Sequence, residues 1–491
     1  MTVTPAACYE AIRSRDARFD GRFFTAVLST GVYCRPICPA RTPKRENVRF
    51  YPCAAAAEAA GFRACRRCRP DTAPGTPAWL GTSATTSRAL RLILDGALDG
   101  GSLEDLSARV GIGPRHLRRL FVAHLGAPPL VVAHTRRVHF ARKLIDETTL
   151  PMTRVAHAAE FPSVRRFNAA IRQAYGRTPT ALRREARDTR AVPADAALVL
   201  RLPFRPPYDW SGLLKFIARR ATPGVEAVGP GTYERTIAVN GTRGSIEVTR
   251  PGWKNHLLLR VRVPDAAPLA VIVERVRRMF DLGADPREIQ ARLRSDRRLR
   301  AALAARPGIR VPGAWDAFEL SVRAILGQQV SVRAATTLAG RLARAWGEPI
   351  GAPDGEDRLS RLFPTPEALA GADLPAIGLP PARARAVRDL AQAVAGGEIR
   401  LTTVADPDEV ARTLTRIAGI GPWTAQYIAM RALGEPDAFP ASDLGLRRAL
   451  SSGRRLMSST DLARHAERWR PWRAYAAMLL WMDEGRHHDV T

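Results

Sequence analysis

The sequence has few lysines, no long apolar run, and no cysteine beyond its first 68 residues. No stretch approaches the roughly 18 uninterrupted apolar residues that a membrane span requires. Residues 1–20 also lack the basic start and apolar core of a secretory signal peptide. We therefore expect a cytoplasmic protein that contacts no membrane. Because thiols stay reduced in the cytoplasm, its paired cysteines are expected to bind metal rather than to form disulfides.

Charge is the strongest compositional signal. Lys and Arg number 76 and Asp and Glu 47 in 491 residues, which gives a net charge of +29 and a pI near 11.2. Codon bias in a GC-rich genome explains a preference for Arg over Lys, but not this excess of cations. The hydrophobic (46%) and charged (25%) fractions are globular values and exclude global disorder. We expect about three domains and a polyanionic partner, usually nucleic acid, so that the protein associates with the nucleoid.

The cysteines form the clearest spacing pattern. Two close pairs, of the types Cys-x3-Cys and Cys-x2-Cys, are made by Cys34, Cys38, Cys65 and Cys68. Two such pairs can bring four thiolates into the tetrahedral arrangement of a zinc site, which this spacing favours over scattered buried thiols. Cys8 and Cys53 belong to no pair, and we expect them to be ordinary core or surface residues.

The residues around these cysteines resemble a known family. Residues 20–23 (DGRF), 30–36 (TGVYCRP) and 61–68 (GFRACRRC) resemble the N-terminal domain of Ada-type methylphosphotriester acceptor proteins, over about residues 8–72. The resemblance implies that the four cysteines bind one zinc ion. It also implies that Cys34 is the nucleophile that takes a methyl group from a DNA phosphotriester.

Such a transfer would change both the bond and the charge of the site. A thiolate attacks an alkyl carbon, and the thioether formed has no route back, so the reaction is stoichiometric. The formal charge of a Zn(Cys)4 centre falls from −2 to −1, which weakens repulsion from DNA phosphates. Nearby cations suited to phosphate contact are Arg35, Arg41, Lys44, Arg45 and Arg49. We therefore expect affinity for DNA to rise after self-methylation.

Two helix-turn-helix patterns follow a Pro/Gly/Thr-rich linker at residues 70–77. The first begins with a capping-box-like Ser102, and the second begins near Thr153; a helix-like segment at 134–147 joins them. The second helix of the second pattern presents four residues of types that read base edges in the major groove, namely Arg165, Arg166, Asn168 and Arg172. A single pattern of this kind also fits an ordinary helical hairpin, but the segment 175–179 (YGRTP) resembles the end of AraC-type regulators.

The C-terminal half begins with a sheet pattern and continues as helix. Residues 183–195 are a predicted linker. Alternating apolar residues at 198–202, 235–239, 245–249 and 256–263 predict a small sheet, with a helix at 213–220. From residue 267 onward the pattern is almost wholly helical.

Two segments of this half carry the chemistry. Residues 417–425 (IAGIGPWTA) predict a helix, a Gly-x-Gly turn and a second helix, so that Gly419, Gly421 and Thr424 are candidate contacts to a DNA phosphate. Twenty residues after Trp423, Asp443 places a carboxylate at the start of another helix, where helix capping is the alternative role. Together these features resemble the helix-hairpin-helix superfamily of base-excision glycosylases.

Three more segments narrow the resemblance to the 3-methyladenine DNA glycosylase II (AlkA-type) family, over about residues 196–487. They are 206–210 (PPYDW), 324–331 (AILGQQVS) and 470–475 (RPWRAY). The resemblance implies that Asp443 stabilises an oxocarbenium-like sugar and activates water. It implies an aromatic base pocket of Phe216, Trp423, Tyr427 and Trp481. It also implies that Gln329, where a relative has Leu, fills the gap left by the flipped nucleotide. Without the resemblance, Trp423 and Trp481 would each be assigned to the hydrophobic core.

Missing residues restrict the chemistry further. Bifunctional relatives carry a Lys in the hairpin where this chain has Trp423, and iron–sulfur relatives need C-terminal cysteines that are absent here. We therefore expect a monofunctional glycosylase without a cluster. The Pro-Cys-His-Arg motif of O6-alkylguanine methyltransferases is also absent. The resemblance admits a monovalent cation at the hairpin, which the sequence neither requires nor excludes.

The sequence thus predicts a multidomain α+β protein in four parts. These are a zinc-bound α/β methyl-acceptor module (1–77), an all-α double helix-turn-helix domain (78–190), a small mixed-sheet subdomain (195–285) and a helix-hairpin-helix glycosylase domain (286–491). We expect a monomer that binds alkylated and promoter double-stranded DNA and, as an activator, RNA polymerase. Two alternatives remain: a regulator whose C-terminal half binds DNA without catalysis, and a repair enzyme whose N-terminal half only anchors it.

Overall fold

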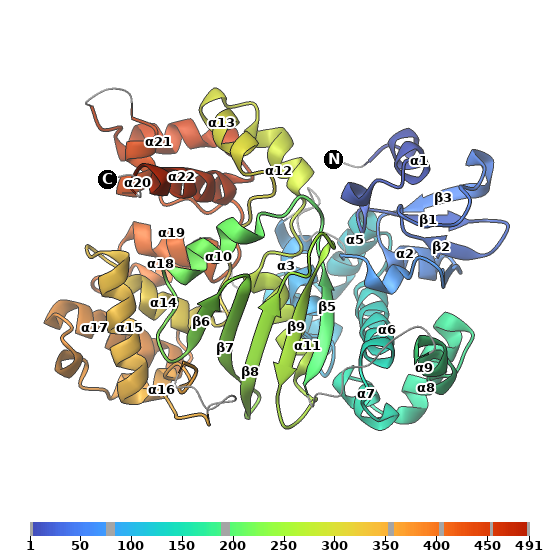
Figure 1. Cartoon of the computed structure of the whole chain (residues 1–491), viewed down its shortest axis with the longest axis horizontal. Helices are drawn as coiled ribbons and strands as arrows, with labels where there is room; N and C mark the ends of the chain where they lie inside the picture. The colour runs from blue at the N-terminus through green and yellow to red at the C-terminus, as the bar shows by residue number, and fades with distance from the viewer. Residues whose placement is uncertain are drawn as a thin grey trace. The chain divides into compact units, whose positions relative to one another are not determined.

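The computed structural model describes residues 3–74, 84–187, 197–351, 358–401, 407–451 and 455–488 (Figure 1). It divides into two compact units. The first unit contains Met1–Pro206, Pro251–Arg277 and Leu282–Ala284, and the second contains Pro207–Arg250, Arg278–Asp281 and Asp285–Thr491. The predicted boundaries at 77 and 190–195 lie outside the described residues, whereas residue 285 caps the start of a helix. No helix in the described ranges has the length and apolar character needed to cross a membrane.

The N-terminal part of the first unit is a small sheet flanked by helices. Its strands have the order β3-β1-β2-β4; β1 is antiparallel to β2 and β3, and β2 is parallel to β4. The elements are α1 (Pro5–Arg13), β1 (Phe24–Val27), β2 (Val32–Cys34), β3 (Val48–Tyr51), α2 (Ala54–Ala59) and β4 (Arg63–Ala64). Cys8 and Cys53 are both buried, and Cys53 donates to the carbonyl of Leu125 at 3.1 Å, so neither joins the paired cysteines.

A group of helices continues the first unit, and α6 is its centre because it contacts α3, α5, α7, α8 and α9 (Figure 1). They are α3 (Ala84–Leu94), α4 (Leu103–Val110), α5 (Pro114–Leu125), α6 (Pro129–Glu147), α7 (Met152–Ala158), α8 (Val164–Tyr175) and α9 (Pro179–Arg187). The predicted capping box at Ser102 and Asp105 is present, and Gly111 ends α4 with a φ of +76°. Ser163 caps α8. Both helix-turn-helix patterns are therefore formed, the second starting one residue earlier than expected.

The predicted strands are all present. In the first unit β5 (Leu198–Pro203) pairs antiparallel with β9 (His256–Arg262). In the second unit β7 (Thr232–Val239) pairs antiparallel with β6 (Glu226–Gly229) and with β8 (Thr242–Thr249). The helix α10 (Trp210–Ala218) begins at Asp209, whose side chain accepts from the amide of Gly212. The helix α11 (Leu269–Met279) follows β9.

The rest of the second unit is helical. Its helices are α12 (Pro286–Leu293), α13 (Arg297–Ala305), α14 (Ala317–Leu326), α15 (Val332–Trp346), α16 (Pro366–Ala370), α17 (Pro381–Ala395), α18 (Pro407–Leu414), α19 (Pro422–Arg431), α20 (Leu444–Ala449), α21 (Ser459–Ala466) and α22 (Arg473–His488). The hairpin helices α18 and α19 contact each other, α19 contacts α14, and α22 contacts α20 (Figure 1). These contacts bring residues of α19, α20 and α22 to one site.

Candidate functional site

The four paired cysteines converge in the first unit. Cys34 ends β2, Cys38 lies in the loop after it, and Cys65 and Cys68 follow β4, so that the parallel β2–β4 pairing brings the two pairs together. Their four Sγ atoms all lie within 4.8 Å of one another. This separation suits four thiolates bound to one ion at about 2.3 Å each. The cluster therefore fits a single zinc ion, as the spacing predicts.

Arg35, expected to face a phosphate, is instead part of the zinc module's interior. Its backbone amide donates to Cys68 Sγ at 3.3 Å, and its guanidinium pairs with Asp20 and donates to Thr72 Oγ1 at 2.6 Å. Burial would lower the pKa of Arg35, but the hydrogen bond and charge of Asp20 raise it. The other four predicted cations, Arg41, Lys44, Arg45 and Arg49, are exposed.

A buried hydrogen-bond network joins the zinc module to α6. Glu58 of α2 accepts from Tyr33 Oη at 2.7 Å and from Thr135 Oγ1 at 2.5 Å, and it contacts His139 Nε2 at 3.2 Å. Burial would raise the pKa of Glu58, but His139 and the two hydroxyls lower it; burial would lower the pKa of His139, but Glu58 raises it. The residue beside Cys34 is thus fixed to the helix that joins the two helix-turn-helix pairs.

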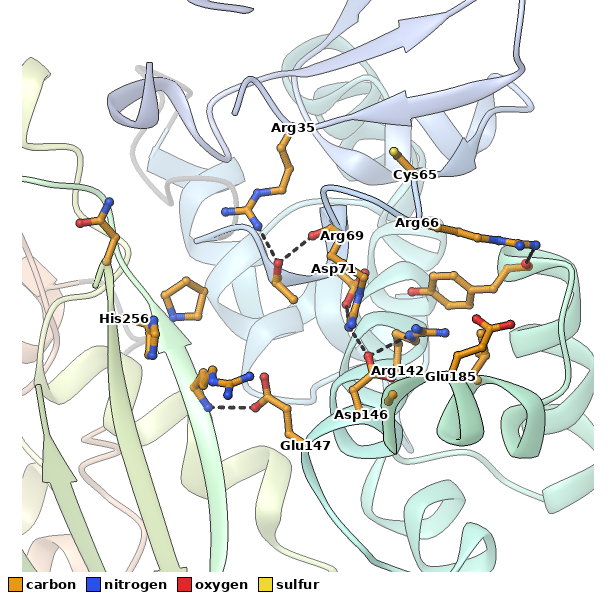
Figure 2. A pocket seen from close by; sticks show the side chains of 17 residues that line it. Arg35, Cys65, Arg66, Arg69, Asp71, Arg142, Asp146, Glu147, Glu185 and His256 are labelled. Atoms are coloured by element: carbon orange, nitrogen blue, oxygen red, sulfur yellow. Dashed lines mark hydrogen bonds and ion pairs between the residues drawn. The ribbon is translucent and has the colours of Figure 1, made fainter. Parts of the chain in front are cut away.

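A second network lies beside a cavity of about 540 Å³ within the first unit (Figure 2). Arg69, next to Cys68, pairs with Asp71 and with Asp146 of α6, and Arg142 binds Asp146 at 2.9 Å. Figure 2 shows these four side chains as one connected series at the cavity wall. Arg66, next to Cys65, reaches the carbonyl of Tyr175 at the end of α8, at 3.5 Å. Neighbours of three cysteines therefore contact the helical part of the unit.

The four residues predicted to read bases lie on α8. Arg165, Arg166 and Arg172 are exposed and Asn168 is half-buried, while Phe167 and Ile171 are fully buried on the other side of the helix. The same division holds for α5, whose arginines are exposed and whose Leu117 and Phe121 are buried.

In the second unit, Asp443 is held by three N–H donors. Its Oδ1 accepts from the backbone amide of Leu446 at 2.9 Å and from Trp481 Nε1 at 2.9 Å. Its Oδ2 accepts from Trp423 Nε1 at 2.8 Å. Asp443 is therefore both the N-cap of α20 and a carboxylate oriented by two indole rings.

The predicted aromatic residues lie together around this carboxylate. The rings of Trp423 and Tyr427 stack at 5.2 Å with an interplanar angle of 11°, and the ring of Trp481 lies 6.1 Å from that of Tyr427. Phe216, on α10, is 7% exposed and adjoins this group through Arg431, whose guanidinium lies 5.1 Å from its ring and 5.5 Å from the ring of Tyr427. We call Trp423, Tyr427, Trp481 and Phe216 the aromatic cluster.

The hairpin loop is fixed by a residue that the sequence did not single out. Gln328, between α14 and α15, donates through Nε2 to the carbonyl of Gly419 and to Thr424 Oγ1, both at 2.8 Å. Thr424 is 2% exposed, so its hydroxyl serves Gln328 and not the surface. Gly419 has a φ of +92°, which favours glycine, and Gly421 begins α19. The neighbouring Gln329 is exposed with a φ of +53°.

Four family models match successive parts of the chain. The family models that match are "Metal binding domain of Ada" (residues 7–71), "Helix-turn-helix domain" (106–185), "AlkA N-terminal domain" (199–316) and "HhH-GPD superfamily base excision DNA repair protein" (322–474). They confirm the predicted resemblances, the multidomain α+β fold class, the single zinc site and the binding of double-stranded DNA. The chain has a DNA glycosylase domain.

Two curated relatives and one solved structure agree with the family models. The "Probable bifunctional transcriptional activator/DNA repair enzyme AlkA" of Mycobacterium tuberculosis is 45% identical over 96% of this chain and 95% of its own length. "DNA-3-methyladenine glycosylase 2" of Escherichia coli is 38% identical over 59% of this chain and 98% of its own length. The structure of a 3-methyladenine DNA glycosylase from Archaeoglobus fulgidus has the same fold over 58% of this chain and 98% of its own, with a TM-score of 0.51 and 23% identity. The chain therefore belongs to the family of bifunctional transcriptional activator/DNA repair enzymes of the AlkA type.

Proposed function

We propose that the second unit excises alkylated bases, 3-methyladenine among them, from DNA by hydrolysis at Asp443. The observation that carries this proposal is the carboxylate held by Trp423 and Trp481 beside a stack of aromatic rings. The relative from Escherichia coli, whose name states a 3-methyladenine glycosylase, supports it over this half.

The chemistry follows from the charges of the reacting groups. Alkylation at purine N3 or N7 makes the base cationic and hence a good leaving group. As the glycosidic bond breaks, positive charge develops on the sugar, and the fixed carboxylate of Asp443 stabilises it. The same carboxylate orients the attacking water and accepts its proton. The aromatic cluster binds the extruded base by stacking, and Gln329, exposed beside the hairpin, fills the gap in the duplex.

We also propose that this activity is monofunctional. Trp423 stands where a Schiff-base lysine would be needed, and its indole is bonded to Asp443. Lys215, on α10, is exposed, whereas its neighbour Phe216 of the aromatic cluster is buried. The protein should therefore leave an abasic site without cutting the strand. Strand cleavage of abasic duplex without added base or nuclease would contradict this.

The test of the glycosylase proposal is release of 3-methyladenine from methylated DNA. Asp443→Asn should slow release by roughly 10²–10³-fold, the usual effect of losing one preorganised electrostatic group. Asp461→Asn is the matched control, because Asp461 lies in the first turn of α21 in the same unit, accepts from the N-cap Ser458 and is exposed. If wild type releases no base, the alternative holds, in which the protein is a regulator whose C-terminal half binds DNA without catalysis.

For the first unit we propose methyl transfer from a DNA methylphosphotriester to Cys34. A zinc ion bound by the four cysteines keeps their thiolates deprotonated at neutral pH. Cys34 Sγ attacks the methyl carbon, the carbon–oxygen bond breaks, and its electron pair stays on the phosphate oxygen. The products are a thioether and a phosphodiester anion. The exposed Arg45 and its neighbours Arg41, Lys44 and Arg49 then contact phosphates with less opposition from the cluster.

The test is methyl uptake from methylated DNA by Cys34→Ser, with Cys8→Ser as a control thiol outside the cluster. We expect uptake to be lost in the first variant only. Undiminished uptake by Cys34→Ser would exclude Cys34 as the acceptor.

We propose that the methylated protein activates transcription through α8, with Arg165, Arg166, Asn168 and Arg172 in the major groove and RNA polymerase as partner. The protein acts as a monomer of four parts, bounded near residues 77, 190–195 and 285. Promoter footprints before and after methylation test this. Equal footprints in both states would leave the first unit as an anchor for a repair enzyme.

A further inference from the structure

Two guanidinium groups lie against the aromatic cluster, that of the buried Arg431 and that of the half-buried Arg220. The guanidinium carbon of Arg220, just after α10, is 3.8 Å from the ring centre of Phe216. Arg431, at the end of α19, lies beside both Phe216 and Tyr427 and donates to Tyr427 Oη at 2.7 Å. Two of the four rings assigned to the base therefore already have a cationic neighbour.

Neither guanidinium is neutralised by an acid. Within the described parts of the chain, no carboxylate lies at ion-pair distance from Arg220 or Arg431. Glu226 and Glu319, which line the same cavity, serve other arginines: Glu226 binds Arg323 at 2.8 Å, and Glu319 binds Arg235 at 2.8 Å and Arg323 at 3.0 Å. A cavity of about 20 Å³, room for one water molecule, is lined by these charged residues.

Buried cations without an acidic partner are rare because desolvation opposes them. Burial lowers the pKa of Arg220, and the charge of Arg431 lowers it further, although Tyr427 acts in the opposite direction. Burial likewise lowers the pKa of Arg431, and Arg323 adds to this, whereas the charge and hydrogen bond of Tyr427 act in the opposite direction. The excess positive charge therefore destabilises the folded state, and it lies beside the rings proposed to bind the base.

This charge affects neutral and cationic lesions in opposite ways. A cationic base stacks poorly on a ring that already has a cation as neighbour. A neutral base gains negative charge as it departs, because the bond from C1′ to the base nitrogen breaks and its electron pair goes to the base. Water supplies hydroxide to C1′. The remaining proton of that water reaches the base through Asp443 or solvent. Fixed positive charge stabilises that departing base.

We propose that Arg220 and Arg431 set the lesion specificity of the glycosylase, by promoting release of neutral damaged bases relative to cationic alkylpurines. This inference rests on the proposed excision of bases at Asp443. Cationic bases leave as neutral molecules and need no such help, so both classes can be substrates of one site.

The experiment compares two duplexes that each carry a single lesion, hypoxanthine (neutral) or 7-methylguanine (cationic), under single-turnover conditions. In Arg220→Met and Arg431→Met, release of hypoxanthine should fall about 10²-fold, while release of 7-methylguanine should stay within about twofold or rise. Arg220→Lys and Arg431→Lys keep the charge and should recover most of the hypoxanthine rate. Arg306→Met is the control, because it breaks an ion pair with Asp209 at the start of α10 without changing charge at the rings.

Equal losses on both lesions in the Met variants, or Lys variants as slow as the Met variants, would overturn the proposal, since those results indicate a purely structural role. Release of 7-methylguanine alone by wild type would also overturn it. Release of neither base, together with no effect of Asp443→Asn, would refute the proposed function itself.

A measurement on wild type covers the case in which the Met variants do not fold. Tryptophan fluorescence titrations with 9-methyladenine and with the 3,9-dimethyladeninium cation compare a neutral and a cationic base of similar shape. We expect the neutral base to bind about tenfold more tightly or better. Tighter binding of the cation would overturn the proposal.

Discussion

Gln328 should be as important to DNA binding as the glycines of the hairpin. Its side-chain Nε2 donates to the carbonyl of Gly419 and to the hydroxyl of Thr424. Its backbone carbonyl accepts from the guanidinium of Arg383 at 2.8 Å. Gln328→Met keeps the length of the side chain and the backbone contact, but removes both donated hydrogen bonds. The hairpin loop then loses this side-chain link to the α14–α15 connection.

The two lost bonds differ in cost. The Gly419 carbonyl is exposed and can accept from water instead, so its loss costs little. The Thr424 hydroxyl is 2% exposed, and leaving a buried polar group without a partner costs about 1–3 kcal/mol. We therefore expect a penalty of about 2 kcal/mol. If the whole penalty falls on the bound state, it corresponds to about 30-fold weaker binding, because 1.4 kcal/mol is a factor of ten.

The assay is the dissociation constant for a duplex with a stable abasic analogue, measured beside the free energy of unfolding in urea. Gln392→Met is the matched control, because Gln392 lies on α17 and makes one long surface hydrogen bond of 3.4 Å. The penalties on binding and unfolding of Gln328→Met together should reach about 2 kcal/mol. If the two variants bind DNA equally within twofold and unfold alike, the hairpin does not depend on Gln328.

Three further predictions concern both units. The pKa of His139 is raised above its ordinary value of 6.5 in the folded protein, so the bond between His139 and Glu58 stabilises the first unit fully below pH 6.5. This contribution is lost as the pH rises through the higher folded pKa of His139. Because the pKa of Glu58 is lowered, its carboxylate stays charged and keeps the bond down to a pH of about 4.5. Thermal melts should show this fall above pH 6.5 in wild type and not in His139→Gln. Trp481→Phe keeps an aromatic ring but removes one hydrogen bond to Asp443. Transition-state stabilisation should fall by about 1.5–3 kcal/mol, so base release should slow about 10–100-fold with little change in DNA affinity. An unchanged rate would refute the role of Trp481 in orienting Asp443. Chelation of the metal should unfold the zinc module, since structural zinc contributes roughly 10 kcal/mol in small peptides, and a melting curve unaffected by chelator would contradict this.

Features set by local spacing could be predicted from the sequence. The capping box at Ser102, the αL turn at Gly111 and the N-cap at Asp443 each depend on residues within a few positions of one another. The cysteine pairs have the same property, and the β2–β4 pairing then joins them. The aromatic cluster came from the family resemblance, because periodicity alone assigns tryptophans to the core.

Interactions between distant parts of the chain could not be predicted in this way. Tyr33 and His139 are 106 positions apart, and nothing in the local sequence of either points to Glu58 between them. Arg35 looked like a surface cation among cations, yet Asp20 makes it internal. The charge of a residue type indicates its chemistry, but only packing decides whether that charge faces solvent, an acid or an aromatic ring.

The contacts beside the cysteines restrict the distance along a duplex at which the protein can bind a phosphotriester and an operator together. Tyr33 and Arg69 adjoin Cys34 and Cys68, and they contact His139 and Asp146 of α6. The proposed recognition helix, α8, follows α6 and α7 in the chain. The methylated phosphate and the base pairs read by α8 should therefore be separated by a set length of duplex. Inserting five base pairs between a phosphotriester and the operator would turn one away from the other, and the protein should then respond to damage or to sequence but not to both at once.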